Sequence, residues 1–269
     1  MLHATDKGKS KLFERYLGKR DADSDKRKVH EEDEITSNVL GPLDFLAAAE
    51  AHRFWQRILA TAGHAGFLLN EPPERIVFDL WPRRKASDTG QSIEPDAFVR
   101  MHWPENRSRI LLIELKWRAP LSRDDQLHRQ WLNYLDDVER EQALHLFIAP
   151  EVSAGAQAPH NIQAGGNVWQ NQQGGSCLVL LSWLHIRSVL SELTKDDSPL
   201  GRWARLSDQF LNKLQIRKFG GFRHLNVNVK IPEKLPEVIF WHPFSWSRLG
   251  SLPDFPHEIS APVFFNHCQ

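Results

Sequence analysis

Ile113-Glu114-Leu115-Lys116-Trp117 is the stretch that decides the predicted fold of this chain. The aliphatic run at residues 110–113 leads into it and is typical of a buried strand. Because side chains alternate along a strand, Glu114 and Lys116 share one face. A carboxylate and an ammonium on the inner face of an apolar strand are costly to bury without partners, so the pair indicates a functional site.

A second predicted strand brings Asp96 to the same place. Residues 97–103 (AFVRMHW) have the composition of a strand, and the turn residues 104–108 (PENRS) separate it from the strand that holds Glu114. In such a hairpin Asp96 lies beside Glu114 and Lys116. Two carboxylates and the Leu115 carbonyl are hard oxygen ligands suited to Mg²⁺ or Mn²⁺. The lysine can orient a water or stabilise charge on a phosphate, which outlines a phosphodiester-cleavage site.

Pro95-Asp96 followed by Glu114-Leu115-Lys116 resembles the signature of the PD-(D/E)XK nuclease superfamily. The three-residue pattern alone is weak, because chance supplies it in most proteins of this size. The predicted order of helix, strand, strand, strand, helix, strand over residues 35–150 adds weight. The resemblance implies an α/β fold with a restriction-endonuclease-like core (αβββαβ), in which helices flank a mixed central sheet, followed by C-terminal helical and irregular additions.

The predicted elements of this core follow from hydrophobic periodicity and turn residues. We expect a first helix over about 38–62, ended by Gly63 and Gly66. Ser122 is the predicted N-cap of a second helix over 123–142, which crosses over the sheet. The predicted strands, which form one mixed sheet whose middle two are an antiparallel hairpin, are 76–81, 97–103, 109–117 and 144–149.

The second predicted helix carries Gln126, Gln130 and Tyr134 at four-residue spacing, which places them on one face. Residues 130–134 (QWLNY) resemble the QxxxY motif of RecB-like branches of the superfamily, where the glutamine and tyrosine lie close to the metal site and the DNA backbone. Taken alone, the pattern is more typical of a polar helix stripe. After the PD and ExK patterns, it predicts that Gln130 and Tyr134 hold Lys116, the water or a phosphate in place.

Some RecB-like proteins also contribute an acidic residue from the first helix to the metal site. Glu50 is the best-placed candidate here because its small neighbours, residues 47–51 (AAAEA), allow close approach. Asp44 and Asp79 compete for the same role. A solvent-facing helical glutamate would give the same pattern.

The resemblance implies a Mg²⁺- or Mn²⁺-dependent phosphodiesterase that cleaves DNA. Asp96, Glu114 and the Leu115 carbonyl would bind the metal, and Lys116 would position or activate the attacking water. Small stand-alone RecB-like nucleases often belong to bacterial antiviral defence or mobile-element systems and work beside an ATPase or helicase. This chain has no Walker-type phosphate loop, so such a motor would be a separate protein.

Two other hypotheses stay open. A catalytically silent nuclease-fold protein could bind DNA or scaffold a larger complex, although such members usually lose one of the motif residues, and all three are present here. In an active enzyme Asp96, Glu114 and Lys116 should converge in an open cleft. The ExK pattern could also be a coincidence in an unrelated α/β enzyme. Asp96 and Glu114 would then point to different faces of the sheet.

Composition limits the remaining possibilities. A chain of 269 residues with zero formal net charge and 41% hydrophobic residues is ordinary for a globular protein. Two cysteines are too few for a zinc site or a disulfide framework, and neither a bilayer-length apolar run nor a secretory signal is evident. We therefore expect a cytoplasmic protein without a membrane segment.

Local charge predicts where DNA would bind. Basic residues dominate between residues 200 and 235, including Arg217 and Lys218, and Arg118 and Arg123 lie near the predicted site. These residues are candidates for phosphate contacts, although a solvated helix face would give the same pattern.

The chain divides into four predicted parts. Residues 1–34 form a charged, flexible arm, and residues 35–150 form the nuclease core. Residues 151–225 form an extension that packs on the core, with a loop or lid at 153–176, a strand at 177–183 and helices at 184–193 and 199–219. Residues 226–269 form an irregular tail rich in aromatic residues and proline.

Overall fold

The computed structural model describes residues 31–86, 90–117, 120–171 and 174–216. These residues form a mixed sheet of five strands in the order β1-β4-β5-β6-β7. The pairs β1–β4 and β4–β5 are antiparallel, whereas β5–β6 and β6–β7 are parallel. The strands are β1 (Arg75–Leu80), β4 (Ala97–His102), β5 (Ser108–Leu115), β6 (Ala143–Ala149) and β7 (Leu178–Ser182).

This sheet confirms the predicted α/β class, the four predicted core strands and the central antiparallel hairpin. Strand β5 lies in the middle of the sheet, and residues 110–115 are buried without interruption. Its apolar run is therefore continuous rather than alternating, as expected for a strand covered on both faces. In the β4–β5 turn, Glu105 and Asn106 have φ values of 60° and 62°, the left-handed conformation that follows the twist of a hairpin.

The predicted helix over 38–62 is wrong in extent. The structure has α3 (Glu31–Val39), a short 3₁₀ helix η1 (Gly41–Phe45) and α4 (Ala48–Thr61). Gly41 and Pro42 explain the break, because glycine and proline disfavour the interior of an α-helix. Gly63, with φ of 82°, follows the end of α4 as predicted.

The predicted continuous helix over 123–142 is also wrong. The structure has α5 (Gln126–Arg129), the π-helix η2 (Gln130–Tyr134) and α6 (Asp137–Glu141). Leu135 is extended, and Asp136 forms a capping box with Glu139 that starts α6 afresh. Ser122 is not an N-cap, because α5 begins at Gln126 and Asp125 occupies its N-cap position.

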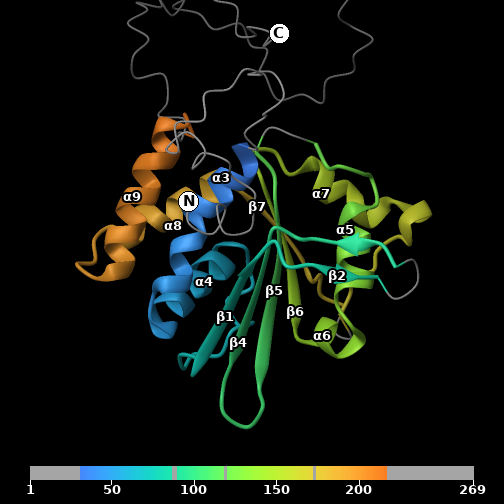
Figure 1. The fold of residues 1–269 in the computed structure, drawn as a ribbon, viewed down its shortest axis with the longest axis horizontal. Helices are drawn as coiled ribbons and strands as arrows, with labels where there is room; N and C mark the ends of the chain where they lie inside the picture. The colour runs from blue at the N-terminus through green and yellow to red at the C-terminus, as the bar shows by residue number, and fades with distance from the viewer. Residues whose placement is uncertain (1–30, 87–89, 118–119, 172–173, 217–269) are drawn as a thin grey trace, which may run out of the picture. The chain divides into compact units, whose positions relative to one another are not determined.

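Helices cover both faces of the sheet. In Figure 1, α4, α8 (Trp183–Leu193) and α9 (Pro199–Lys213) lie to one side, and α5, α6 and α7 (Ser153–Gln157) lie to the other. Helix α4 contacts both α8 and α9. The rings of Phe54 and Trp203 meet edge to face at 4.9 Å between centroids, so α9 is fastened to α4.

Several predictions for the flanking segments need correction. The stretch predicted as a loop at 153–176 contains α7, two 3₁₀ turns (η3, Ala158–His160, and η4, Ile162–Ala164) and a bridge between Gln170 and Ser176. A two-stranded ribbon, β2 (Arg84–Lys85) with β3 (Ser92–Ile93), precedes β4. The predicted tail at 226–269 and residues 1–30 of the predicted arm lie outside the described residues.

None of the helices in the described part of the chain has the length and apolar content that a membrane span requires.

The close packing at the start of α9 generates a first prediction. A Cβ on Gly201 would overlap the backbone carbonyl oxygen of Asp196, so Gly201→Ala must displace backbone at the start of α9. We expect a loss of about 1–3 kcal/mol in the free energy of unfolding, measured by urea denaturation. The matched control is Gly66→Ala, because a Cβ there meets no atom within 4 Å. Equal stability of the two variants would contradict this packing.

Candidate active site

The β4–β5 hairpin brings three predicted site residues together. Ala97 pairs with Ile113, so Asp96 and Glu114 lie beside each other, just before β4 and near the end of β5. The Leu115 backbone N–H donates to Asp96 Oδ2 at 2.7 Å, and Lys116 Nζ pairs with Glu114 Oε1 at 2.7 Å. Asp96, Glu114 and Lys116 are only 8%, 2% and 6% exposed. We call this group the carboxylate–lysine cluster.

A fourth member of the cluster is Glu32 on α3. Its Oε1 lies 2.9 Å from Lys116 Nζ, and its Oε2 accepts the Trp117 backbone N–H at 3.0 Å. The sequence placed Glu32 in the flexible arm at 1–34, and this site residue was missed. The signal was the acidic run at residues 31–34 directly before the apolar Ile35.

Glu50 does not join the cluster in this structure. Its Oε1 accepts the Leu200 backbone N–H at 3.3 Å, at the start of α9. A glutamate there satisfies an otherwise unpaired N–H of the first helical turn. Asp44 is exposed, and Asp79 lies in β1 opposite Phe98. The acidic side chain that a helix contributes to the carboxylate–lysine cluster is therefore Glu32 of α3.

Two glutamines hold the Glu114 carboxylate. Gln126 Nε2 donates to Glu114 Oε1, and Gln130 Nε2 donates to Glu114 Oε2, each at 2.6 Å. Gln130 is 2% exposed, so it contacts the carboxylate from within the protein. Gln126 shares the predicted helix face with Gln130 but was not predicted as a site residue.

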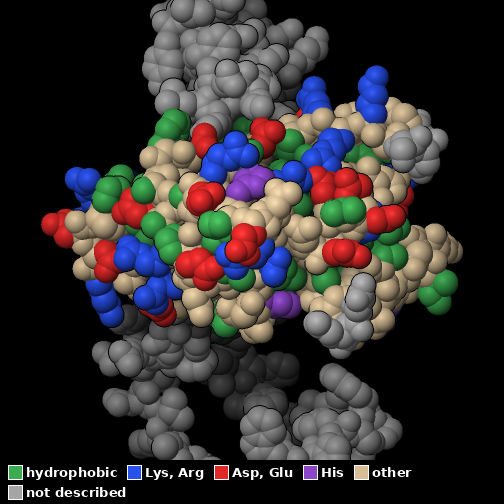
Figure 2. Space-filling view, turned by 90° about the horizontal axis from the view of Figure 1, so that it is seen from below, with side chains coloured by type: hydrophobic (Ala, Val, Ile, Leu, Met, Phe, Trp, Pro, Cys, Tyr) green, Lys and Arg blue, Asp and Glu red, His purple; other side chains and the backbone are tan. Residues whose placement is uncertain are grey.

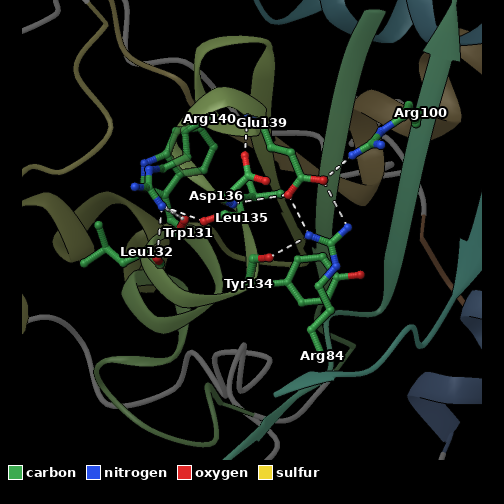
Figure 3. Close-up of polar contacts among 9 residues, drawn as sticks. All are labelled: Arg84, Arg100, Trp131, Leu132, Tyr134, Leu135, Asp136, Glu139 and Arg140. Carbon is green, nitrogen blue, oxygen red and sulfur yellow. Dashed lines mark hydrogen bonds and ion pairs between the residues drawn. The ribbon is translucent and has the colours of Figure 1, made fainter. Parts of the chain in front are cut away.

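Tyr134 belongs to a different cluster, drawn in Figure 3. The Arg84 guanidinium lies 4.5 Å from the centre of the Tyr134 ring, and Phe98 packs against the same ring. Arg84 and Arg100 both pair with Glu139. Burial raises the pKa of Tyr134 to about 12. Residues 130–134 form a π-helix, whose wider turn breaks the four-residue alignment on which the predicted role of Tyr134 depended.

Burial controls the electrostatics of the carboxylate–lysine cluster. It raises the pKa of Asp96 well above the ordinary value, and the Glu114 carboxylate raises it further. Burial also raises the pKa of Glu114, against the opposing effects of Lys116 and Gln130. Burial lowers the pKa of Lys116, but the neighbouring carboxylates outweigh it and the net shift is upward. Three carboxyl groups therefore share one ammonium.

The donor set fits a hard divalent cation. Asp96, Glu114 and Glu32 offer carboxylate oxygens, and one lysine does not balance their charge, so a cation would relieve the cost of burying them. Among the described residues, however, no group of three or more His, Cys, Asp or Glu side chains is placed so that it could hold a metal ion. Lys116 stands between Glu114 and Glu32, so a cation that binds Glu114 Oε1 must displace the contact of either Lys116 or Gln126.

The cluster adjoins a pocket of about 840 Å³. Lys116 and Trp117 form part of its wall, together with Leu121, Phe147 and Trp183. The Trp183 indole donates to the Lys116 carbonyl at 2.9 Å, which fixes the backbone where the strand leaves the sheet. Of the four members of the carboxylate–lysine cluster, Lys116 lines this pocket, whereas Asp96, Glu114 and Glu32 are not among its lining residues.

The predicted DNA-contact residues are largely outside the described structure. Arg118, Arg217 and Lys218 lie outside it, and Arg123 is exposed and pairs with Asp125. On the face seen in Figure 2, at the end of the molecule with the β4–β5 turn, acidic and basic side chains are intermingled.

No family model, no curated protein and no solved structure matches this chain. The function is therefore inferred from the residues and the geometry of the carboxylate–lysine cluster.

The raised pKa of Asp96 generates a second prediction. In metal-free buffer Asp96→Asn should increase the free energy of unfolding by roughly 0.5–2 kcal/mol, because the amide is neutral and still accepts the Leu115 N–H. Folded wild-type protein retains the Asp96 proton to a higher pH than the unfolded chain does, so it loses stability as the pH rises through the folded-state pKa. The increase in the free energy of unfolding of Asp96→Asn over the wild type should therefore be small near pH 4 and reach its full size above the folded-state pKa of Asp96.

Denaturant unfolding in EDTA across this pH range measures the difference between the variant and the wild type. The control is Asp124→Asn, which changes an exposed carboxylate. A gain for Asp96→Asn that is the same at every pH would contradict the proposed electrostatic origin.

Proposed function

We propose that this chain is a metal-dependent DNA nuclease with a restriction-endonuclease-like core. The observation that carries the proposal is the convergence of Asp96, Glu114 and Lys116 at the end of the β4–β5 hairpin. The order of α4, β1, β4, β5, the α5–α6 segment and β6 supports the αβββαβ core that the resemblance implies. The ribbon β2–β3 is an addition to that order.

Each cluster residue has a distinct role in this proposal. Asp96 and Glu114 would hold Mg²⁺ or Mn²⁺, with the Leu115 carbonyl as a further ligand. The bound ion would supply Lewis acidity toward the scissile phosphate. Glu32 pairs with the Lys116 ammonium, which would orient the attacking water or stabilise phosphate charge.

The glutamines act on the carboxylate in this proposal. Gln126 and Gln130 donate to both oxygens of Glu114 and so fix its plane. Gln130 is therefore proposed to orient a metal ligand, and not to contact DNA directly. We further propose, from the resemblance alone, that the chain works beside a separate ATPase or helicase in a defence or mobile-element system.

A specific observation favours a second candidate, a catalytically silent DNA-binding or scaffolding protein. Glu114 is 2% exposed and already accepts bonds from Lys116, Gln126 and Gln130. Lys116 is in turn paired with Glu32. Such a mutually satisfied network can serve structure alone.

A cleavage assay separates the two candidates and is the third prediction. Linear, circular and single-stranded DNA should be cleaved with Mg²⁺ or Mn²⁺ and poorly with Ca²⁺, whose looser coordination suits this chemistry less. Asp96→Asn and Glu114→Gln should lower the cleavage rate by about 100-fold or more and weaken ion binding. Lys116→Met should lower cleavage to the same extent while ion binding, measured by calorimetry, persists.

The same substitution at two helix glutamates, Glu32 and Glu50, gives a test variant and its matched control. Glu32→Gln should slow cleavage because it frees the Lys116 ammonium, whereas Glu50→Gln, at the start of α9, should cleave at the wild-type rate. Wild-type cleavage by Lys116→Met would overturn the nuclease proposal. A wild-type protein that binds DNA but does not cleave it with any of these ions would favour the silent candidate.

A further inference from the structure

A chain of buried hydrogen bonds leads away from Glu114 into the protein. Gln130 Nε2 donates to Glu114 Oε2 at 2.6 Å, and Gln130 Oε1 lies 3.2 Å from His145 Nε2. The Trp169 indole Nε1 donates to His145 Nδ1 at 3.2 Å. Glu114 lies on β5, Gln130 begins η2, His145 lies on β6, and Trp169 precedes β7, so four separate segments meet in this chain.

The chemistry of Trp169 determines the direction of every bond in the chain. An indole N–H can only donate, so His145 Nδ1 is the acceptor. A neutral imidazole then carries its proton on Nε2, which donates to Gln130 Oε1. That leaves the Gln130 amide nitrogen turned toward Glu114. The reversed amide would set an oxygen against the carboxylate and an N–H against an N–H.

We propose that Trp169 locks His145 in its Nε2-protonated tautomer, and that His145 is thereby a positioning residue that fixes the Gln130 amide toward Glu114. The proposal for the tautomer is independent of any catalytic activity. Its consequence for cleavage rests on the proposed nuclease function.

Burial strengthens the hydrogen bonds that select the His145 tautomer. Trp169 and His145 are 0% exposed and Gln130 is 2% exposed, so solvent does not compete for their hydrogen bonds. The Trp131 ring stacks on the His145 ring with an interplanar angle of 7°, which limits the movement of the imidazole. Burial lowers the pKa of His145 to about 3, so the ring is neutral at neutral pH, as a tautomer lock requires.

Backbone bonds hold Trp169 in place. The Cys177 backbone N–H donates to the Trp169 carbonyl at 2.6 Å, and the His145 backbone N–H donates to the Cys177 carbonyl at 2.8 Å. Trp169, which donates the hydrogen bond, and His145, which accepts it, are therefore both hydrogen-bonded to the backbone of Cys177, just before β7. The segment after η4 thus has a specific role that a surface loop would not have.

The second glutamine is oriented in the same way. The Ser122 backbone N–H donates to Gln126 Oε1 at 2.8 Å, which turns the Gln126 amide nitrogen toward Glu114. Both amides thus have a donor on the oxygen and present their nitrogen to the carboxylate. Glu114 is oriented through two independent routes, one from a backbone amide and one from the imidazole.

The test of the tautomer is a long-range ¹H–¹⁵N correlation spectrum of protein labelled with ¹⁵N-histidine, with the His145 signals assigned by their absence in His145→Gln. Wild-type protein should show the Nε2-protonated pattern. Trp169→Phe removes the donor to Nδ1 and should give a mixture of tautomers. A wild-type Nδ1-protonated pattern, or an unchanged pattern in Trp169→Phe, would overturn the proposal.

The matched control is Trp131→Phe. It also removes a buried indole N–H beside the same imidazole, but that N–H donates to the Val168 carbonyl and takes no part in the chain. The tautomer pattern should therefore persist in Trp131→Phe. A mixture of tautomers in this control would show that packing, and not the Trp169 hydrogen bond, selects the tautomer.

Cleavage kinetics then test the positioning role. Trp169→Phe should lower the cleavage rate by about 10- to 100-fold. His145→Gln, which keeps one donor and one acceptor, should retain more activity than His145→Leu at equal folded content by circular dichroism. Equal rates for wild type and Trp169→Phe would overturn the positioning role. Absence of cleavage in wild-type protein would overturn the proposed function and leave the tautomer result standing.

Discussion

The structure depends on the burial of several carboxyl groups around one ammonium at the end of a central strand. Asp96 and Glu114 are buried beside Lys116, the partly exposed Glu32 pairs with the same ammonium, and burial raises the pKa of both Asp96 and Glu114. Unpaired buried charge is among the most costly features a protein can contain. Much of the surrounding architecture supplies hydrogen bonds to this group, which is the pattern expected of a functional site held at some cost in stability.

The surrounding elements serve the cluster in different ways. The hairpin register sets Asp96 beside Glu114, and α3 delivers Glu32 from a distant part of the sequence. The π-helix η2 begins at Gln130, and the helical segment before it supplies Gln126. A π turn in place of a regular α-helical turn is a frequent feature of functional sites. The geometry of the carboxylate–lysine cluster therefore depends on contacts from three helical segments (α3, α5 and η2) and from the β4–β5 hairpin.

The strands and the central cluster could be predicted from sequence because their signals are local. The apolar run before Glu114 and the turn residues at 104–108 determine the hairpin, and the hairpin determines where Asp96 lies. The helical contributions could not be predicted as reliably. Glu32 resembles any residue of a charged arm, and only tertiary contact with Lys116 distinguishes it from Glu50. The helix face that grouped Gln130 with Tyr134 assumed α-helical spacing, which a π-helix does not keep.

The proposed nuclease function requires the carboxylate–lysine cluster to bind a divalent cation. Anomalous diffraction from crystals of the chain soaked in Mn²⁺ tests this binding most directly, because the ion is located without reference to activity. We predict a peak bound by the carboxylates of Asp96 and Glu114, with the Lys116 ammonium moved away from Glu114 Oε1. A Lys116–Glu114 ion pair that persists at saturating Mn²⁺, with no peak at these carboxylates, would contradict the proposed function.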